Sequence, residues 1–196
     1  MRVAKEAANL LYTGQEKEYR QAKLCAAENL GLRVLPSNVE VALELDRIAE
    51  EREGAERQEG LVAKRREAFQ IMQILEGFSP VLVGSVWRGT ARRDSDIDIT
   101  VYAKDLQQPR SALKKGSYLI TQVEEQRVTK RGREEGAFHI HLKLPSSDEA
   151  EIVVRSPEEV DRKVMCEIYG DVITGLTTKQ LRRILRESPV KRFLPA

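Results

Sequence analysis

The chain has 196 residues, 41% of them hydrophobic and 33% charged, so it is long enough to bury a core and too apolar to be disordered. Its net charge of +2 is too small to indicate a nucleic-acid-binding protein by itself, and Cys25 and Cys166 fit no metal-ligand spacing. No apolar run is long enough for a signal peptide or for the ~20 residues that cross a bilayer, so we expect a cytoplasmic protein without a membrane partner.

Helical periodicity dominates the first part of the chain. The apolar spacing predicts four helices, over residues 2–12, 15–30, 39–53 and 61–76. Ser37 or Asn38 is placed to cap the third helix, and Gly31 is placed to end the second. Gly54 and Gly60 are expected to interrupt the charged stretch between the last two helices.

The pattern then changes to that of strands. Short apolar or alternating runs predict strands at residues 79–84, 96–102, 118–128, 137–144 and 149–155. A helix is expected at about 106–114 and a charged turn at 130–136. Ser156 and Glu159 have the spacing of a capping box that starts a helix, and a last helix is expected from Thr177 or Thr178 to about Pro189.

Three regions follow from these elements: a helical N-terminal region at 1–76, an α/β core at 77–155 and a helical C-terminal region at 156–196. Consecutive strands joined by short turns favour a mixed or antiparallel sheet over a doubly wound one. The predicted fold class is therefore α+β, with a mixed sheet flanked by helices.

The first two predicted strands enclose the strongest chemical signal. The first ends at Gly84-Ser85, where the chain turns into a short helix. Backbone N–H groups at such a turn favour an anion, Gly84 lets a phosphate approach the backbone, and the Ser85 hydroxyl adds a donor. A Gly-x-x-x-x-Gly-Lys-Ser/Thr phosphate-binding loop is absent from the sequence.

Asp96 and Asp98 begin the second strand two residues apart, so both carboxylates face the same way while Ile97 and Ile99 face a buried side. Two neighbouring carboxylates repel each other unless a cation lies between them. Divalent cations with oxygen ligands fit, and Mg²⁺ is the usual partner of phosphates. A phosphate-binding turn beside a carboxylate pair indicates two-metal phosphoryl or nucleotidyl transfer.

This arrangement resembles the DNA polymerase beta-like nucleotidyltransferase superfamily. Its signature is Gly-Ser, roughly ten residues, Asp-x-Asp on a strand and a third acid on a later strand. The resemblance covers about residues 77–155 and includes the Arg-Gly-Thr-Ala-Arg-x-Asp-Ser-Asp segment that ends at Asp96. It implies a polymerase beta-like core, Mg²⁺ or Mn²⁺ as cofactor and a nucleoside triphosphate as substrate.

The resemblance implies a third carboxylate, for which Glu151 is chosen because apolar residues flank it on a predicted strand. Members of the superfamily mostly have Asp there, so the glutamate is a departure. Glu149 lies on the same predicted strand face and is the alternative. The Val153-Val154 pair that follows looks most like the strand of the archaeal type of CCA-adding enzyme.

Arginines fill the segment between the two strands. Arg88, Arg92 and Arg93 are candidates to hold a triphosphate, with Arg88 first because it lies one turn into the short helix. Loop solubility is the competing interpretation. Trp87 is expected to pack against the sheet rather than to stack on a base.

His139 and His141 alternate on one predicted strand face, but no third soft ligand lies near them in the sequence, so a zinc site is disfavoured. A weaker hypothesis brings them to the nucleotide from a strand next to the site. The segment 179–192 carries six basic residues and a single acidic one, Glu187, which suits RNA phosphates or a solvated helix face.

The resulting hypothesis is a two-metal nucleotidyltransferase. Asp96, Asp98 and Glu151 would be its catalytic and metal-binding residues, and Gly84, Ser85, Arg88 and Arg92 would bind the nucleotide. An RNA or tRNA end is the favoured acceptor. The alternatives are transfer to a protein or a small molecule, and a nucleotide- or RNA-binding module of the same fold without turnover.

Overall fold

A computed structural model describes residues 2–130 and 133–195. The chain divides into two compact units. Unit 1 comprises Met1–Arg57, Met165–Val172 and Pro195–Ala196, and unit 2 comprises Gln58–Val164 and Ile173–Leu194. In the described part of the chain, no helix has the length and apolarity needed to cross a membrane.

Unit 1 is built on three helices: α1 (Arg2–Tyr12), α2 (Tyr19–Asn29) and α3 (Asn38–Glu53). Their buried contact residues are largely alanines, whose small side chains let helix backbones approach closely. The cap predicted for α3 is confirmed: Ser37 accepts from the Glu40 N–H, and the Glu40 carboxylate accepts from the Ser37 N–H. The segment 165–172 joins this unit through a hydrogen bond from Asn38 to the Glu167 carbonyl.

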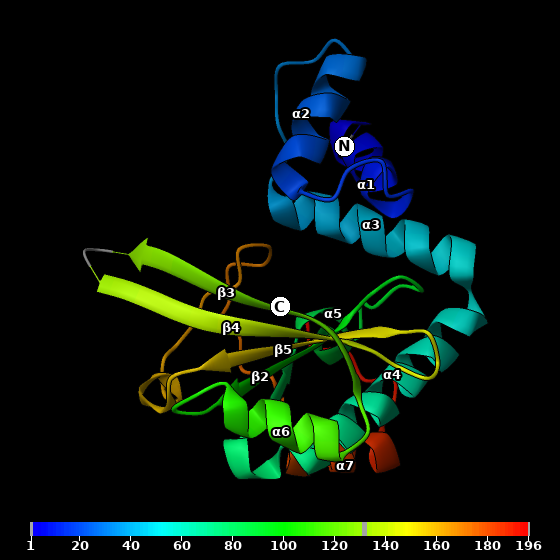
Figure 1. Cartoon of the computed structure of the whole chain (residues 1–196). Helices are drawn as coiled ribbons and strands as arrows, with labels where there is room; N and C mark the ends of the chain where they lie inside the picture. Colours follow the sequence, from blue (N-terminus) through cyan, green and yellow to red (C-terminus); the bar gives the residue numbers. More distant parts are fainter. Residues whose placement is uncertain (1, 131–132, 196) are drawn as a thin grey trace. The chain divides into compact units, whose positions relative to one another are not determined.

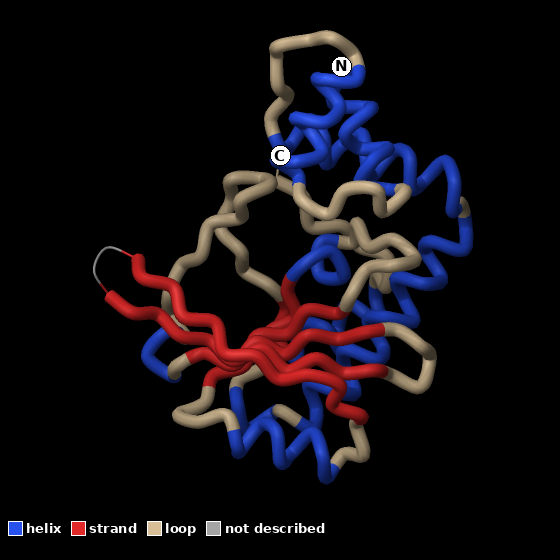
Figure 2. The backbone as a smooth tube through the Cα atoms, turned by 45° about the horizontal axis from the view of Figure 1, so that its top comes forward, coloured by secondary structure: helices blue, strands red, loops and turns tan. Residues whose placement is uncertain are grey.

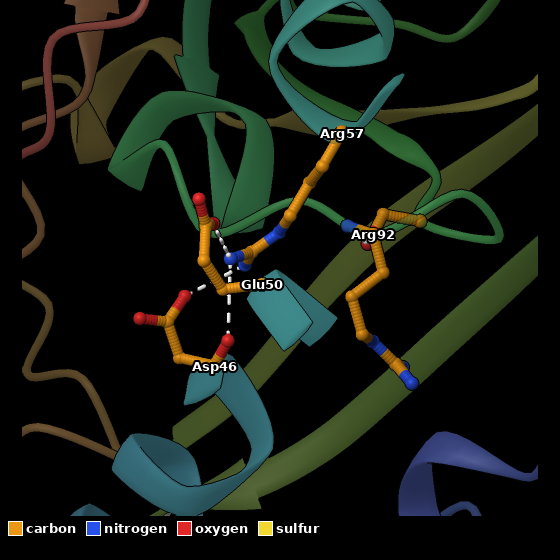
Figure 3. Close-up of polar contacts among 5 residues, drawn as sticks. Asp46, Glu50, Arg57 and Arg92 are labelled. Atoms are coloured by element: carbon orange, nitrogen blue, oxygen red, sulfur yellow. Dashed lines mark hydrogen bonds and ion pairs between the residues drawn. The ribbon is translucent and has the colours of Figure 1, made fainter. Parts of the chain in front are cut away.

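Helix α4 (Ala55–Ile74) begins directly after Gly54, whose φ of +55° ends α3. The prediction that Gly60 also interrupts this stretch is wrong, because α4 continues through it. A glycine inside a helix costs only about 1 kcal/mol, which other contacts of the helix offset. One such contact is buried Arg57, which pairs with Asp46 at 2.6 Å and with Glu50 at 2.9 Å (Figure 3).

Unit 2 contains a six-stranded sheet with strand order β3-β4-β5-β2-β1-β6. Its strands are β1 (Val81–Val83), β2 (Ile97–Tyr102), β3 (Leu119–Lys130), β4 (Arg133–Lys143), β5 (Glu149–Arg155) and β6 (Leu176–Thr177). Neighbouring strands are antiparallel except β2 and β5, which are parallel. This confirms the predicted α+β class and the mixed sheet.

Helices α4, α6 (Gln107–Lys115) and α7 (Thr178–Glu187) lie on one face of the sheet (Figures 1 and 2). That face presents the fully buried side chains of β2, β4 and β5, which pack with helix residues such as Ile71, Leu113 and Leu181. Because side chains alternate along a strand, the polar residues of the same three strands point to the opposite face. The candidate site lies on that polar face.

Some element boundaries differ from the expectations. The turn expected at 130–136 is shorter, because β3 extends to Lys130 and β4 begins at Arg133, while 131 and 132 lie outside the described residues. The helix expected from Ser156 is only a 3₁₀ turn, η2 (Pro157–Glu159), without a side-chain cap at Ser156. Glu159 instead pairs with Arg155 and Arg162, which removes it from a capping box.

The C-terminal helix begins as expected. Thr177 caps α7, accepting from the Gln180 N–H, and the helix ends at Glu187. Two short elements, η1 (Glu76–Phe78) and β6, were not expected from the sequence.

Candidate active site

Gly84 is the point where β1 gives way to the short helix α5 (Gly84–Arg88). Its φ of +68° is in the left-handed region that favours glycine. Val83 pairs with Asp98 across β1 and β2, and a Cβ added to Gly84 would lie 1.9 Å from the Asp98 Oδ2 atom. The missing side chain is therefore what lets this turn lie against the Asp98 carboxylate.

Two of the predicted carboxylates occupy facing positions on parallel strands. Asp98 of β2 pairs in register with Glu151 of β5, while Ile97 and Ile99 are fully buried on the other face. The structure therefore brings Asp98 and Glu151 together, and Asp96 directly precedes β2. Burial raises the pKa of Asp98 to about 7, with further contributions from the negative charges of Glu151 and Asp96.

Asp96 is exposed as a whole residue, but its carboxyl group is partly desolvated. This burial raises its pKa, and the negative charges of Glu149 and Glu151 raise it further. Lys64 opposes this shift. Lys64 is buried on α4 and pairs with Asp148 at 2.5 Å, next to the start of β5. Nothing in the sequence pattern distinguishes this lysine from the many other charged residues of the predicted helices.

Glu149 lies two residues before Glu151 and pairs with Lys143 of β4 at 3.0 Å between Nζ and Oε1. Its side chain is 64% exposed, against 27% for Glu151. Of the two, Glu151 is the one that is directly in register with Asp98.

Strand β4 places both histidines beside Glu151. His141 pairs with Glu151 across β4 and β5, and His139 lies two residues away on the same face. The His139 Nδ1 atom is 2.7 Å from Glu151 Oε1, and the His141 Nε2 atom is 3.9 Å from the same oxygen. The alternation in the sequence indicated a shared face but not this carboxylate partner.

The donor set suits a hard divalent cation, because carboxylate oxygens predominate. Burial and then the negative charges of Glu151 and Asp96 raise the pKa of Asp98, so a bound cation would favour its ionised form. Among residues 2–130 and 133–195, no three His, Cys, Asp or Glu side chains already form a group that holds an ion. The Glu151 carboxylate is turned to His139. Asp96, Asp98 and Glu151 are the residues that would hold such an ion.

The arginines of the connecting segment have different surroundings. Arg88 is 4% exposed, its guanidinium lies 4.5 Å from the Trp87 ring centroid, and its Nη1 donates to the Phe193 carbonyl. The Arg92 N–H donates to Ser95 Oγ within the loop, and Arg93 is exposed. Trp87 is 3% exposed within the core, which confirms its expected packing role.

Arg65 of α4 binds the backbone of the short helix that follows the Gly84 turn. This fully buried guanidinium donates to four backbone carbonyls: Val86 at 3.1 Å, Trp87 at 2.9 Å, Pro189 at 2.6 Å and Lys191 at 2.8 Å. The first two are carbonyls of α5, the helix that begins at Gly84. The sequence does not indicate this role of Arg65, because its partners are backbone carbonyls that are distant in sequence.

One protein-family model matches this chain. Residues 65–173, more than half of the chain, match the family model described as a nucleotidyltransferase domain. No curated protein matches the chain.

Several solved structures are similar to the chain at low sequence identity. A cytoplasmic RNA terminal U-transferase shares 19% identity over 60% of this chain, with a TM-score of 0.31. Cid1 in complex with a UTP analogue shares 17% over 57%, with a TM-score of 0.35, and the GLD-2/RNP-8 complex shares 16% over 63%, with a TM-score of 0.33. The matches cover 34%, 36% and 39% of those chains.

Proposed function

The chain belongs to the nucleotidyltransferase domain family, and we propose that it moves a nucleoside monophosphate from a nucleoside triphosphate to an acceptor hydroxyl with the help of a divalent metal. The observation that carries the proposal is the position of Asp98, which lies in register with Glu151 and against the Gly84 turn. Carboxylates beside a turn that accepts phosphate are what transfer at an α-phosphorus requires.

Each residue of the site has a proposed role. The Gly84 turn and the Ser85 hydroxyl bind the β- and γ-phosphates, and Arg92 adds positive charge from the loop. Arg88 is also proposed to bind the triphosphate, although its Nη1 donates to the Phe193 carbonyl in this structure. Bound Mg²⁺ or Mn²⁺, held by Asp96, Asp98 and Glu151, supplies charge neutralisation for the phosphates.

The transfer forms a bond between the acceptor oxygen and the α-phosphorus and breaks the bond from the α-phosphorus to the α,β-bridging oxygen. Pyrophosphate leaves with that electron pair, and the acceptor loses its hydroxyl proton. Glu151 is proposed to accept this proton or to orient the hydroxyl that loses it.

An RNA end is the favoured acceptor. The exposed basic residues of the C-terminal part support it, since cations neutralise the phosphates of a nucleic-acid backbone. They are Lys179, Arg182, Arg183, Arg186, Lys191 and Arg192. Transfer to a protein or a small molecule is the alternative.

A nucleotide-binding module without turnover is a second candidate. The bond between Glu151 and His139 supports it, because it occupies one of the two carboxylate oxygens that a metal or a substrate could use.

The test uses labelled triphosphates with total RNA or total protein and measures pyrophosphate release in Mg²⁺. We expect Asp96→Asn with Asp98→Asn to abolish the release, whereas Asp94→Asn, an exposed neighbour, leaves it unchanged. Unchanged turnover in the double variant would contradict the catalytic assignment. Label in RNA selects the favoured acceptor, label in protein selects the alternative, and binding without release selects the module.

A further inference from the structure

The two histidines of β4 differ in how they contact Glu151. His139 Nδ1 is within hydrogen-bond distance of Oε1 at 2.7 Å, whereas His141 Nε2, at 3.9 Å from the same oxygen, is not. The His139 side chain is only 14% exposed, against 37% for His141. Of the two histidines, only His139 is close enough to hold the glutamate by a hydrogen bond.

The direction of this bond follows from the chemistry of its partners. With Glu151 ionised, its carboxylate only accepts hydrogen bonds, and the Nδ1 atom of His139 is then the donor. Elsewhere in the described part of the chain, no hydrogen-bond donor reaches the other oxygen, Oε2. One oxygen of Glu151 is thus fixed by the protein and the other is left for a further partner.

Glutamate has one more rotatable bond than aspartate, so ordering its carboxylate costs more side-chain entropy. A hydrogen bond to one oxygen removes much of that freedom. Carboxylates that bind metals are commonly held in this way, and loss of the holding partner lowers metal affinity about 10–100-fold.

We propose that His139 is a positioning residue that fixes the Glu151 carboxylate beside Asp98 through its Nδ1–H. The inference rests on the proposed function, because it assigns Glu151 to the metal. In this role His139 acts through Glu151 and not by direct contact with the substrate or the metal.

The first experiment measures Mn²⁺ binding to the full chain by electron paramagnetic resonance, without nucleotide. His139→Leu is expected to weaken binding about 10–100-fold. His139→Asn is expected to restore most of it, since the Asn amide places a donor near the position of Nδ1. His141→Leu is the matched control and is expected to stay within about threefold of the parent protein, as befits a contact beyond hydrogen-bond distance.

The outcomes separate this inference from the proposed function. Loss of Mn²⁺ binding in Asp98→Asn together with parent-like binding in His139→Leu overturns the role of His139 alone. Unchanged binding in Asp98→Asn, or no binding by the parent protein, overturns the metal assignment and the inference with it. Equal losses in His139→Leu and His141→Leu also overturn the specific role of His139.

A second measurement needs neither metal nor activity. His139 and His141 are the two histidines of the chain, so a ¹⁵N-histidine-labelled His141→Leu protein has one imidazole to observe. We expect its long-range ¹H–¹⁵N spectrum to show a proton on Nδ1. A neutral ring protonated only at Nε2 would overturn the proposed bond, even if the protein is folded and active.

Discussion

Asp98 is confined on several sides at once. The Gly84 backbone lies against its carboxylate, Glu151 faces it from the neighbouring strand, and Asp96 lies two residues before it. Each of these neighbours disfavours the ionised form, through loss of water or through negative charge. A carboxyl group in this position is costly to keep charged in the absence of a cation.

This cost predicts an unusual pH dependence of stability. The pKa of Asp98 is raised from 3.8 to about 7 in the fold, so between these values the folded chain keeps a proton that the unfolded chain has lost. The stabilisation is full below the unfolded pKa and is lost as the pH rises through the folded pKa. In metal-free protein, Asp98→Asn should therefore raise the free energy of unfolding at pH 8 by about 1–3 kcal/mol, and by much less at pH 5.

Urea unfolding in EDTA at the two pH values measures this difference. Asp94→Asn, at an exposed position, is the control and should behave like the parent protein at both pH values. A parent-like pH profile for Asp98→Asn would show that Asp98 keeps an ordinary pKa.

The sequence predicts those residues of the candidate site that lie close together in the chain, but not the contacts that form between strands. Gly84-Ser85 and Asp96 with Asp98 are close in the chain, so their spacing alone predicts a shared location. The partners of Glu151 depend on the register between β4 and β5, which strand periodicity does not specify. The contact with His139 therefore became visible only in the structure.

At the scale of elements, α5 is too short to be stable by itself and depends on contacts with its surroundings. Arg65 supplies them at its C-terminal end, where a cation interacts favourably with the helix dipole. Burial lowers the pKa of Arg65 only to about 10, so the guanidinium remains charged at neutral pH. The same side chain also holds the segment after α7.

Replacement of Arg65 should lower the free energy of unfolding even when the positive charge is kept. A lysine has three donors on a single nitrogen and does not reach four separate carbonyls, so Arg65→Lys leaves buried acceptors unpaired. We expect a loss of about 2–4 kcal/mol in the free energy of unfolding. Arg66→Lys, at the exposed next residue, should change it by less than about 0.5 kcal/mol. Equal effects of the two substitutions in urea unfolding would contradict this role for Arg65.

Most helices and strands could be predicted from their periodicity, and the errors lie where long-range contacts override local signals. Gly60 reads as a helix breaker, but α4 continues through it. Leu176 and Thr177 have no alternating pattern that would predict a strand. They form β6 because they pair with the edge of β1. The hairpin strands exceed their predicted lengths because they pair with each other along β3 and β4.

At the scale of the whole molecule, the two units have separate hydrophobic cores. The core of unit 1 is formed by α1, α2 and α3, and that of unit 2 by the sheet and its covering helices. Ile48 is buried in the first core and Ile71 in the second. Two cores without shared members are expected to open as separate cooperative units.

Matched substitutions test this expectation. Ile48→Val and Ile71→Val each remove one buried methyl group, at a cost of about 0.5–1.5 kcal/mol. Under native conditions, each should accelerate amide hydrogen exchange in its own unit and leave the other unit within error of the parent protein. Acceleration spread over both units by either substitution would show that the whole chain opens as one.

The parallel pairing of β2 with β5 also has a kinetic consequence. Asp98 and Glu151 meet across the sequence interval that holds α6 and the whole β3–β4 hairpin, so their contact cannot form until that interval has been closed. Closing such a loop becomes only slowly more costly as it lengthens, so residues added to the hairpin would delay assembly little. We therefore expect the Asp98–Glu151 pair to form after the β3–β4 hairpin, and residues inserted between β3 and β4 to change the folding rate little.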